Sequence, residues 1–205
     1  MKITLAKIGR RFNREWIFKN IDYTFEKGKS YAILGINGSG KSTLLQVISG
    51  SLSQSTGEIN YILDDKNIET DAVFNYLALS APYLELIEEF TLTEVLSFHF
   101  EFKKRLNSIN NQELIALLNM ESSKNKQIKY FSSGMKQRVK LALAFCSDTP
   151  ILLLDEPTSN LDEEGIAWYH SLVSKFTNNR LVIVCSNQAH EYSFCQEQIR
   201  ISDFK

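Results

Sequence analysis

Residues Gly35-Ile36-Asn37-Gly38-Ser39-Gly40-Lys41-Ser42 fit the pattern G-x-x-x-x-G-K-[ST] of a phosphate-binding loop. The glycines permit backbone angles that let successive N–H groups converge on one anion. Lys41 adds a mobile positive charge for the outer phosphates, and Ser42 offers a hydroxyl to Mg²⁺. We expect Thr43 to open the next helix, whose positive end faces the phosphates. The candidate phosphate contacts are therefore Gly35, Asn37, Gly38, Ser39, Gly40, Lys41, Ser42 and Thr43.

The flanks of this loop have the pattern that the motif requires. Residues 31–34 form an apolar run that enters the loop as a buried strand does. Apolar residues then recur at helical spacing over 44–48. Strand, loop and helix in this order argue against a chance glycine turn.

Length and composition favour a globular protein without a nucleic-acid partner. The 205 residues suffice for one domain with a substantial core. The formal net charge of −1 gives no basic excess for nucleic acid. The first residues are too short an apolar stretch for a signal peptide, and no run approaches the ~18 apolar residues of a membrane span. We expect a cytoplasmic protein, and if it serves a membrane it does so through a partner.

Periodicity predicts an α/β core with a helical insert. Strand patterns, the first two of them typical of an antiparallel edge sheet, occupy 2–8, 21–25, 31–34, 58–63, 72–79, 151–154 and 181–185. Helical patterns occupy 94–102, 112–119 and 134–146, and another helix follows Asp162 as its N-cap. We expect one domain over 1–205, with its core at 1–80 and 147–205 and a helical subdomain at about 81–146.

Asp155 and Glu156 stand at the end of the apolar run 151–154. A carboxylate there can bind at a Mg²⁺ site beside the phosphates, and a second can take the proton from water attacking the γ-phosphate. Two adjacent acids taken alone can be solvated loop residues. Downstream of a phosphate-binding loop, we assign Asp155 to the metal and Glu156 to catalysis.

Two further motifs complete a resemblance to the ATP-binding cassette (ABC) family, the nucleotide-binding subunits of ABC transporters. Residues 131–138, Phe-Ser-Ser-Gly-Met-Lys-Gln-Arg, are similar to the family signature L-S-G-G-Q, and residues 159–162, Ser-Asn-Leu-Asp, resemble its D-loop. The four motifs match in order and spacing over nearly the whole chain. The resemblance implies a P-loop NTPase core with a mixed, mostly parallel sheet, an antiparallel β edge subdomain and an α-helical subdomain. It also implies ATP and Mg²⁺ as cofactors.

The signature implies a second subunit. Ser132 supplies a hydroxyl, and Gly134 lets the backbone approach a phosphate and starts a helix from Met135 onward. In the family this element lies far from the phosphate loop of its own subunit. The resemblance implies a head-to-tail pair, either a homodimer or a heterodimer, in which each signature closes the other subunit's ATP site.

The family stacks adenine on an aromatic residue ahead of the phosphate loop. Phe12 matches that position, and Trp16 is the alternative. Either ring can instead belong to the core.

Two positions depart from the family pattern, and both bear on hydrolysis. Asn187 stands where the family has its switch histidine, and Ala81 stands at the Q-loop glutamine when the segment is aligned on Pro82. Asn187 can donate a hydrogen bond to phosphate but carries no charge, so we expect slow turnover. Ser80 and Glu85 are the nearest substitutes for the glutamine.

The resemblance implies that ATP hydrolysis drives transport through a separate integral membrane permease subunit at the inner face of the cell membrane. A hydrolysis-impaired, ATP-gated binding or regulatory module is the alternative, and the neutral charge disfavours a member acting on nucleic acid. An apolar cluster lies among the acidic residues Glu85, Glu88 and Glu89. It either packs on the chain's own core or binds a short helix of the permease. Its members are Tyr83, Leu84, Leu86, Ile87 and Phe90.

Overall fold

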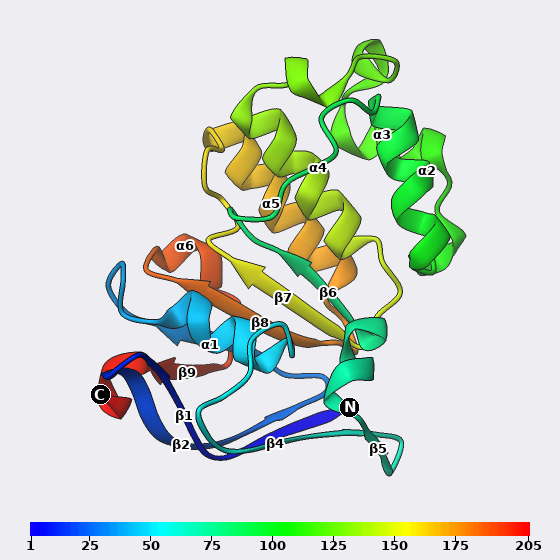
Figure 1. The fold of residues 1–205 in the computed structure, drawn as a ribbon. Helices are drawn as coiled ribbons and strands as arrows, with labels where there is room; N and C mark the ends of the chain where they lie inside the picture. The colour runs from blue at the N-terminus through cyan, green and yellow to red at the C-terminus, as the bar shows by residue number, and fades with distance from the viewer. The chain divides into compact units, whose positions relative to one another are not determined.

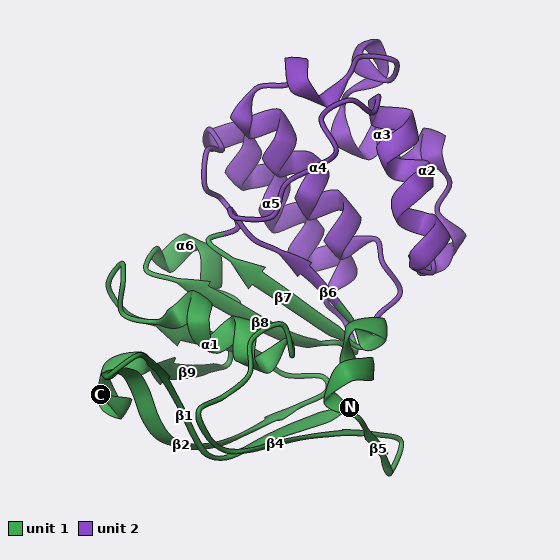
Figure 2. Cartoon of the chain, viewed as in Figure 1, with its two compact units in different colours: residues 1–77, 150–156, 179–205 green, residues 78–149, 157–178 purple.

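The computed structural model describes residues 1–205, which divide into two compact units (Figure 2). The first unit comprises Met1–Leu77, Pro150–Glu156 and Asn179–Lys205. The second comprises Ala78–Thr149 and Pro157–Asn178. None of the helices combines the length and apolar character that crossing a membrane requires.

Strands and helices follow one another along the chain in the order drawn in Figure 1. The strands are β1 (Lys2–Phe12), β2 (Glu15–Glu26), β3 (Ser30–Leu34), β4 (Thr56–Leu63), β5 (Lys66–Ile68), β6 (Leu77–Ser80), β7 (Ile151–Asp155), β8 (Leu181–Ser186) and β9 (Glu197–Arg200). The α-helices are α1 (Lys41–Ile48), α2 (Leu92–Phe102), α3 (Asn111–Leu118), α4 (Ser133–Phe145), α5 (Glu163–Phe176) and α6 (Ala189–Tyr192). Short 3₁₀ helices cover Thr70–Tyr76, Leu106–Ser108, Glu121–Ser123, Ile128–Tyr130 and Ile201–Phe204.

The first unit contains an antiparallel sheet with the strand order β2-β1-β4-β5. The central strand β1 pairs antiparallel with both β2 and β4. Ile3, Leu5 and Ile8 of β1 are buried, as are Ile21 and Phe25 of β2. The alternation in the sequence thus reflects a sheet with one covered face, and the expected antiparallel sheet is confirmed.

The first unit also contains parallel strands in the order β7-β8-β3-β9. Every residue of β7 and β8 is buried, which explains their uninterrupted apolar runs. Helix α1 packs against both strands. Because the carboxyl ends of parallel strands meet at one sheet edge, the segments after β3, β7 and β8 come together there. The predicted α/β class, with a parallel and an antiparallel sheet, is confirmed.

The second unit is a helical body around a buried apolar cluster from α2, α3 and α4. Two capping boxes start its helices, one joining Thr91 to Glu94 and the other joining Asn110 to Glu113. Helix α5, which the sequence analysis assigned to the core, belongs to this unit. Its Trp168 side chain packs against the cluster and donates an indole hydrogen bond of 2.8 Å to the carbonyl oxygen of Leu117.

Three sequence expectations about local structure are corrected. The predicted strand 72–79 is a 3₁₀ helix over Thr70–Tyr76 followed by the short strand β6, because only Val73 of the 3₁₀ segment is buried. The helix after the phosphate loop begins at Lys41 rather than at Thr43, because Gly40 at φ 107° is its N-cap. The signature helix begins at Ser133 rather than at Met135, since Ser132 caps it.

Candidate nucleotide site

The phosphate loop connects β3 to α1 and depends on glycines at positions 35 and 40. A Cβ on Gly35 would lie 2.4 Å from Ser39 Oγ and 2.6 Å from Ile201 Cγ2. Gly40 has φ 107°, and a Cβ there would lie 2.4 Å from Ile17 Cγ2. Both positions therefore exclude a side chain, which keeps the backbone N–H groups at the start of α1 accessible to an anion.

Lys41 is the buried cation of this loop. Its side chain is only 4% exposed, and its ammonium donates hydrogen bonds of 2.8 Å to the Gly35 carbonyl and 3.2 Å to the Ile36 carbonyl. The hydroxyl oxygen of Ser39 is buried in the same loop without a hydrogen-bond partner. Both groups can donate hydrogen bonds to a bound anion with little rearrangement of the chain.

Asp155 and Ser42 form a site whose chemistry fits Mg²⁺. Asp155 is 1% exposed, and the Ser42 hydroxyl donates a hydrogen bond to its carboxylate. Its Oδ1 atom is buried without any hydrogen-bond partner, and such an orphaned oxygen calls for a ligand. Carboxylate and hydroxyl oxygens suit Mg²⁺, which retains several waters and so needs only a few protein ligands. The residues present therefore fit the ion.

Burial raises the pKa of Asp155 to about 6. The carboxylates of Glu156 and Glu191 raise it as well, whereas the Ser42 hydrogen bond and the Lys41 ammonium lower it. A bound cation would favour the ionised form of this buried carboxyl.

Glu156 and Asn187 follow the neighbouring strands β7 and β8. Glu156 has a φ of 43°, unusual for a residue with a side chain, and its N–H donates a 2.9 Å hydrogen bond to the Cys185 carbonyl. The Asn187 side-chain amide donates a 3.1 Å hydrogen bond to Asn37 Oδ1 in the phosphate loop. The structure therefore brings Asn187 to the loop, in a pocket of about 650 Å³ lined also by Gly38 and Ser39.

A buried pair that the sequence reasoning missed holds the segment that carries Asn187. The Ser186 hydroxyl donates to the Glu191 carboxylate and accepts the Gln188 N–H at 2.8 Å. Ser186 and Glu191 are both 0% exposed. The only signal in the sequence was a glutamate in an otherwise unremarked short helix, which is too weak to identify such a role.

The second unit places the signature residues around a separate pocket of about 440 Å³. Ser132 caps α4, its Oγ accepting the Met135 N–H at 3.2 Å. A Cβ on Gly134 would lie 2.9 Å from the Asn160 carbonyl oxygen, so this glycine allows the D-loop to pack closely. The pocket is also lined by Asn119. Ser132 and Gly134 thus lie together, in a different unit from the phosphate loop.

The segment at the Q-loop position has no amide side chain facing outward. Ala81 is fully buried, and its carbonyl oxygen accepts a 3.1 Å hydrogen bond from the Lys140 ammonium of α4. Burial lowers the pKa of Lys140. The side-chain amide of Gln137, which is 2% exposed, donates a 2.8 Å hydrogen bond to the Pro157 carbonyl oxygen. The sequence analysis also missed this contact of the signature helix.

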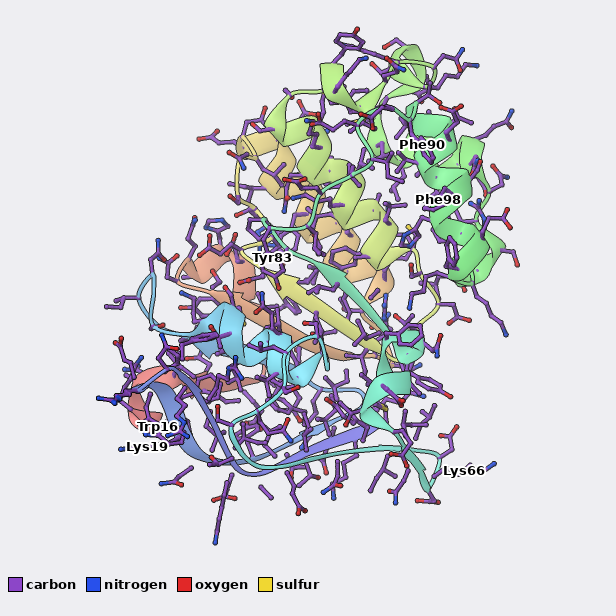
Figure 3. All side chains as sticks on the ribbon, viewed as in Figure 1. Trp16, Lys19, Lys66, Tyr83, Phe90 and Phe98 are labelled. Carbon is purple, nitrogen blue, oxygen red and sulfur yellow. The ribbon has the colours of Figure 1, made fainter.

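The remaining candidates divide between exposed and packed side chains. Phe12 is 46% exposed. In the apolar cluster of the second unit, Tyr83, Leu84 and Ile87 are exposed, whereas Leu86 and Phe90 pack against the helical core. Phe90 also stacks edge-on against Phe98 of α2, with ring centroids 5.5 Å apart (Figure 3). Part of this cluster is therefore packed in the helical core and part is exposed.

Comparison with known proteins decides the family. The model of the family described as "ABC transporter" matches residues 18–159, well over half of the chain. The chain belongs to the ABC transporter family. An uncharacterised ABC transporter ATP-binding protein, YybJ of Bacillus subtilis, is 29% identical over 190 residues, which cover 92% of this chain and 86% of YybJ.

Solved cassettes have the same fold. A putative ABC transporter ATP-binding protein from Pyrococcus furiosus superposes with a TM-score of 0.82 at 22% identity over 100% of both chains. The dimeric structure of MJ0796, a bacterial ABC transporter cassette, superposes with a TM-score of 0.80 at 23% identity, over 97% of this chain and 94% of that one. The chain is thus an ATP-binding subunit of an ABC transporter and an ATPase, which uses ATP and Mg²⁺.

Proposed function

We propose that the phosphate loop holds the ATP phosphates, that Ser42 and Asp155 hold Mg²⁺, and that Glu156 is the catalytic base. The observation that supports this most directly is the buried, unpartnered Asp155 Oδ1 beside the Ser42 hydroxyl. A desolvated carboxylate with a free oxygen has no structural explanation in this chain, whereas a cation next to bound phosphates accounts for it. Held by Ser42 and Asp155, Mg²⁺ would supply positive charge that offsets the negative charge of the phosphates.

Hydrolysis then follows from the positions of three side chains. Lys41 exchanges its bonds to the Gly35 and Ile36 carbonyls for the outer phosphates. Glu156 accepts a proton from the attacking water while the oxygen of that water bonds to the γ-phosphorus and the bond to the leaving ADP oxygen breaks. Asn187 donates its amide N–H to the γ-phosphate in place of Asn37 Oδ1. Since an amide adds no charge, we expect slow turnover.

The site is completed by a second subunit. Ser132, Gly134 and the N-terminus of α4 form an anion-accepting surface in the second unit, and we assign it to the γ-phosphate of ATP held by a partner cassette. The dimeric cassette MJ0796 supports this arrangement by its likeness in fold. The pair is either a homodimer or a heterodimer with a second cassette.

A membrane permease is the other partner. The exposed side chains of Tyr83, Leu84 and Ile87 give it an apolar contact, and the acids Glu85 and Glu89 beside them suit basic residues of a short permease helix. The chain would then lie on the inner face of the cell membrane without entering it. Tyr83→Ala with Ile87→Ala should abolish co-purification with the permease, whereas the exposed Phe74→Ala of the first unit should not.

Binding and hydrolysis assays test the central assignment. Asp155→Asn should abolish the Mg²⁺ dependence of ATP binding, and Glu156→Gln should preserve binding but remove phosphate release. An unchanged Mg²⁺ dependence in Asp155→Asn would exclude this residue from the metal site. A rate of the unmodified chain equal to that of Glu156→Gln would exclude hydrolysis at this site.

A further inference from the structure

A second lysine, Lys205, binds the phosphate loop from a distant part of the chain. Its ammonium donates a 2.8 Å hydrogen bond to the Ser39 carbonyl oxygen in the loop and one of 2.9 Å to the Ile17 carbonyl oxygen of β2. These two partners lie 166 and 188 positions away along the chain. Lys205 therefore joins the phosphate loop to β2 through two main-chain oxygens.

Strand pairing and packing hold the segment before Lys205 beside the loop. Strand β9 runs parallel to β3, the strand that leads into the loop, with Leu34 and Arg200 as register partners. The 3₁₀ helix after β9 packs against β2. Its Ile201 is fully buried, and the Cγ2 atom lies only 2.6 Å from where a Cβ on Gly35 would be. The backbone that carries Lys205 is thus fixed next to the loop.

The hydrogen bond to the Ser39 carbonyl fixes the direction of the next N–H group. In a planar trans peptide the carbonyl oxygen and the N–H group point to opposite sides, and the chain has no cis peptide bond. Because the Ser39 oxygen is held by Lys205, the Gly40 N–H points away from the ammonium. Glycine tolerates many backbone angles, so this peptide would turn more easily without the hydrogen bond.

The Gly40 N–H is one of the groups that an anion at the start of α1 would bind. Gly40 is the N-cap of α1, and its carbonyl oxygen accepts the Leu44 N–H at 2.9 Å, which begins the hydrogen bonding of the helix. The N–H of an N-cap residue has no acceptor within its helix and lies at the positive end of the helix dipole. Its value to a phosphate oxygen depends on the orientation of the peptide.

We propose that Lys205 is a positioning residue of the nucleotide site, which holds the peptide between Ser39 and Gly40 with its N–H directed at the ATP phosphates. Lys205 contacts this peptide on the side opposite to that N–H, and it touches no part of the nucleotide. It therefore differs from Lys41, which turns to the phosphates when they bind. The inference rests on the proposed function, in which the phosphate loop binds ATP.

Isotope labelling makes this one peptide visible by NMR. Serine–glycine peptides occur at three places in the sequence, 39–40, 49–50 and 133–134. With carbonyl-¹³C serine and ¹⁵N glycine, a carbonyl–amide correlation spectrum of the full chain therefore contains three signals. Lys205→Met removes the donor but keeps the length of the side chain, so it should move the Ser39 carbonyl resonance upfield and leave the other two signals in place. Lys205→Arg, which keeps a charged donor, should move it less.

Calorimetric titration with inorganic tripolyphosphate and with ATP measures the consequence for binding. Lys205→Met should weaken the binding of both ligands about fivefold, as expected for one hydrogen bond, and by equal factors because the loss lies at the phosphates. Lys205→Arg should recover most of the affinity. The matched control is Arg200→Met, since the exposed Arg200 carries the same charge and lines the same pocket as Lys205 but is not hydrogen-bonded to a loop carbonyl. It should change both affinities by less than about twofold, because exposed charges are screened.

Three results would each overturn the inference. The first is a Ser39 carbonyl signal that stays in place in Lys205→Met. The second is an equal loss of affinity in Lys205→Met and Arg200→Met, which would reduce the effect to charge alone. The third is a Ser39 signal of the unmodified chain that moves to its Lys205→Met position when tripolyphosphate binds, because the ammonium would then leave the carbonyl for the phosphates.

The same titrations keep this inference apart from the proposed function. Loss of both ligands in Lys41→Ala supports the phosphate loop, whatever the Lys205 variants do. If the unmodified chain bound neither ligand, both proposals would fail. If Lys205→Met bound both ligands as tightly as the unmodified chain, only the positioning role would fail. Where Lys205→Met proves unfolded by circular dichroism, Lys205→Gln takes its place: with a single neutral amide donor it should bind both ligands more weakly than Lys205→Arg, and equal affinities would overturn the inference.

Discussion

The side-chain amide of Asn187 donates a 3.1 Å hydrogen bond to Asn37 Oδ1, joining the end of β8 to the phosphate loop. This amide is neutral, so it can orient a phosphate but cannot compensate its charge. We predict that Asn187→His raises kcat for ATP hydrolysis roughly tenfold, since phosphoryl-transfer sites depend on electrostatic stabilisation. Steady-state phosphate release measures the effect.

Glu156→Gln provides the control for that experiment. Its rate should fall to background both alone and together with Asn187→His, because the gain would require Glu156 as the proposed catalytic base. A histidine variant no faster than the unmodified chain would show that the missing charge does not limit turnover. If turnover of the unmodified chain is slow as expected, the cause would then lie at another position, and Ala81 would be the next to change.

Two loop glycines with positive φ should respond differently to alanine. Gly40→Ala should destabilise the chain by roughly 2 kcal/mol or more and abolish ATP binding, because its Cβ would lie 2.4 Å from Ile17 Cγ2. Gly38→Ala should cost only about 1 kcal/mol, since it has the backbone strain of φ 76° but no atom within 4 Å of its Cβ. Urea denaturation and ATP titration measure both effects.

Equal losses in these two variants would mean that backbone strain alone governs the loop. The steric argument depends on the contact between β2 and the phosphate loop, so Ile17→Ala combined with Gly40→Ala should recover part of the stability. No recovery would contradict the contact.

Strong local patterns made much of the fold predictable. The apolar run before Asp155 predicted β7, and the N-cap Asp162 is confirmed by the 2.8 Å hydrogen bond from the Gly165 N–H to its Oδ1. Such signals are local, because a buried parallel strand and a helix cap each impose residue types on a few adjacent positions.

Contacts between distant residues were beyond the sequence. The segment 72–79 has the composition of a strand but begins as a 3₁₀ helix, and its one buried residue there, Val73, lies beside Gly50, a neighbour that no local pattern reports. The bond from Gln137 to the Pro157 carbonyl and the pairing of Ser186 with Glu191 are likewise tertiary. The sequence could suggest candidates for the residues that carry the chemistry, but not the residues that hold those candidates in place.

His99 should make stability depend on pH. The Ser147 hydroxyl donates its proton to the Leu143 carbonyl at 2.7 Å, so it accepts the Nε2–H of a neutral His99 at 2.9 Å. Burial, with smaller contributions from the positive charges of Lys103 and Arg105, lowers the pKa of His99 from 6.5 to about 4. Because the pKa of His99 is lower in the folded state than in the unfolded state, the neutral ring stabilises the fold. This contribution to the free energy of unfolding is complete above pH 6.5 and is lost as the pH falls towards 4.

Urea denaturation between pH 7.5 and 4 measures this term. In His99→Phe, the free energy of unfolding should fall less between pH 7.5 and 4, by at most about 2 kcal/mol. This figure is discounted from the full pKa shift because the ring is partly exposed to solvent. Ser147→Ala should lower stability throughout that range but keep the slope, since it removes the hydrogen bond and not the titrating group. An unchanged slope in His99→Phe would assign the acid sensitivity to other groups.

Ser132→Ala should separate a helix cap from a nucleotide contact. The Ser132 hydroxyl accepts the Met135 N–H, so its loss should cost about 1 kcal/mol of stability. Thr91→Ala removes a comparable cap on α2, where Thr91 accepts the Glu94 N–H, and should cost a similar amount. Of these two capping residues, Ser132 lines the pocket around Gly134 and Thr91 does not. We therefore expect Ser132→Ala, but not Thr91→Ala, to weaken ATP-dependent dimerisation. Sedimentation of both variants in a Glu156→Gln background, where ATP persists, measures the dimer. If Ser132→Ala and Thr91→Ala lost the dimer equally, Ser132 would act only as a helix cap and not as a nucleotide contact.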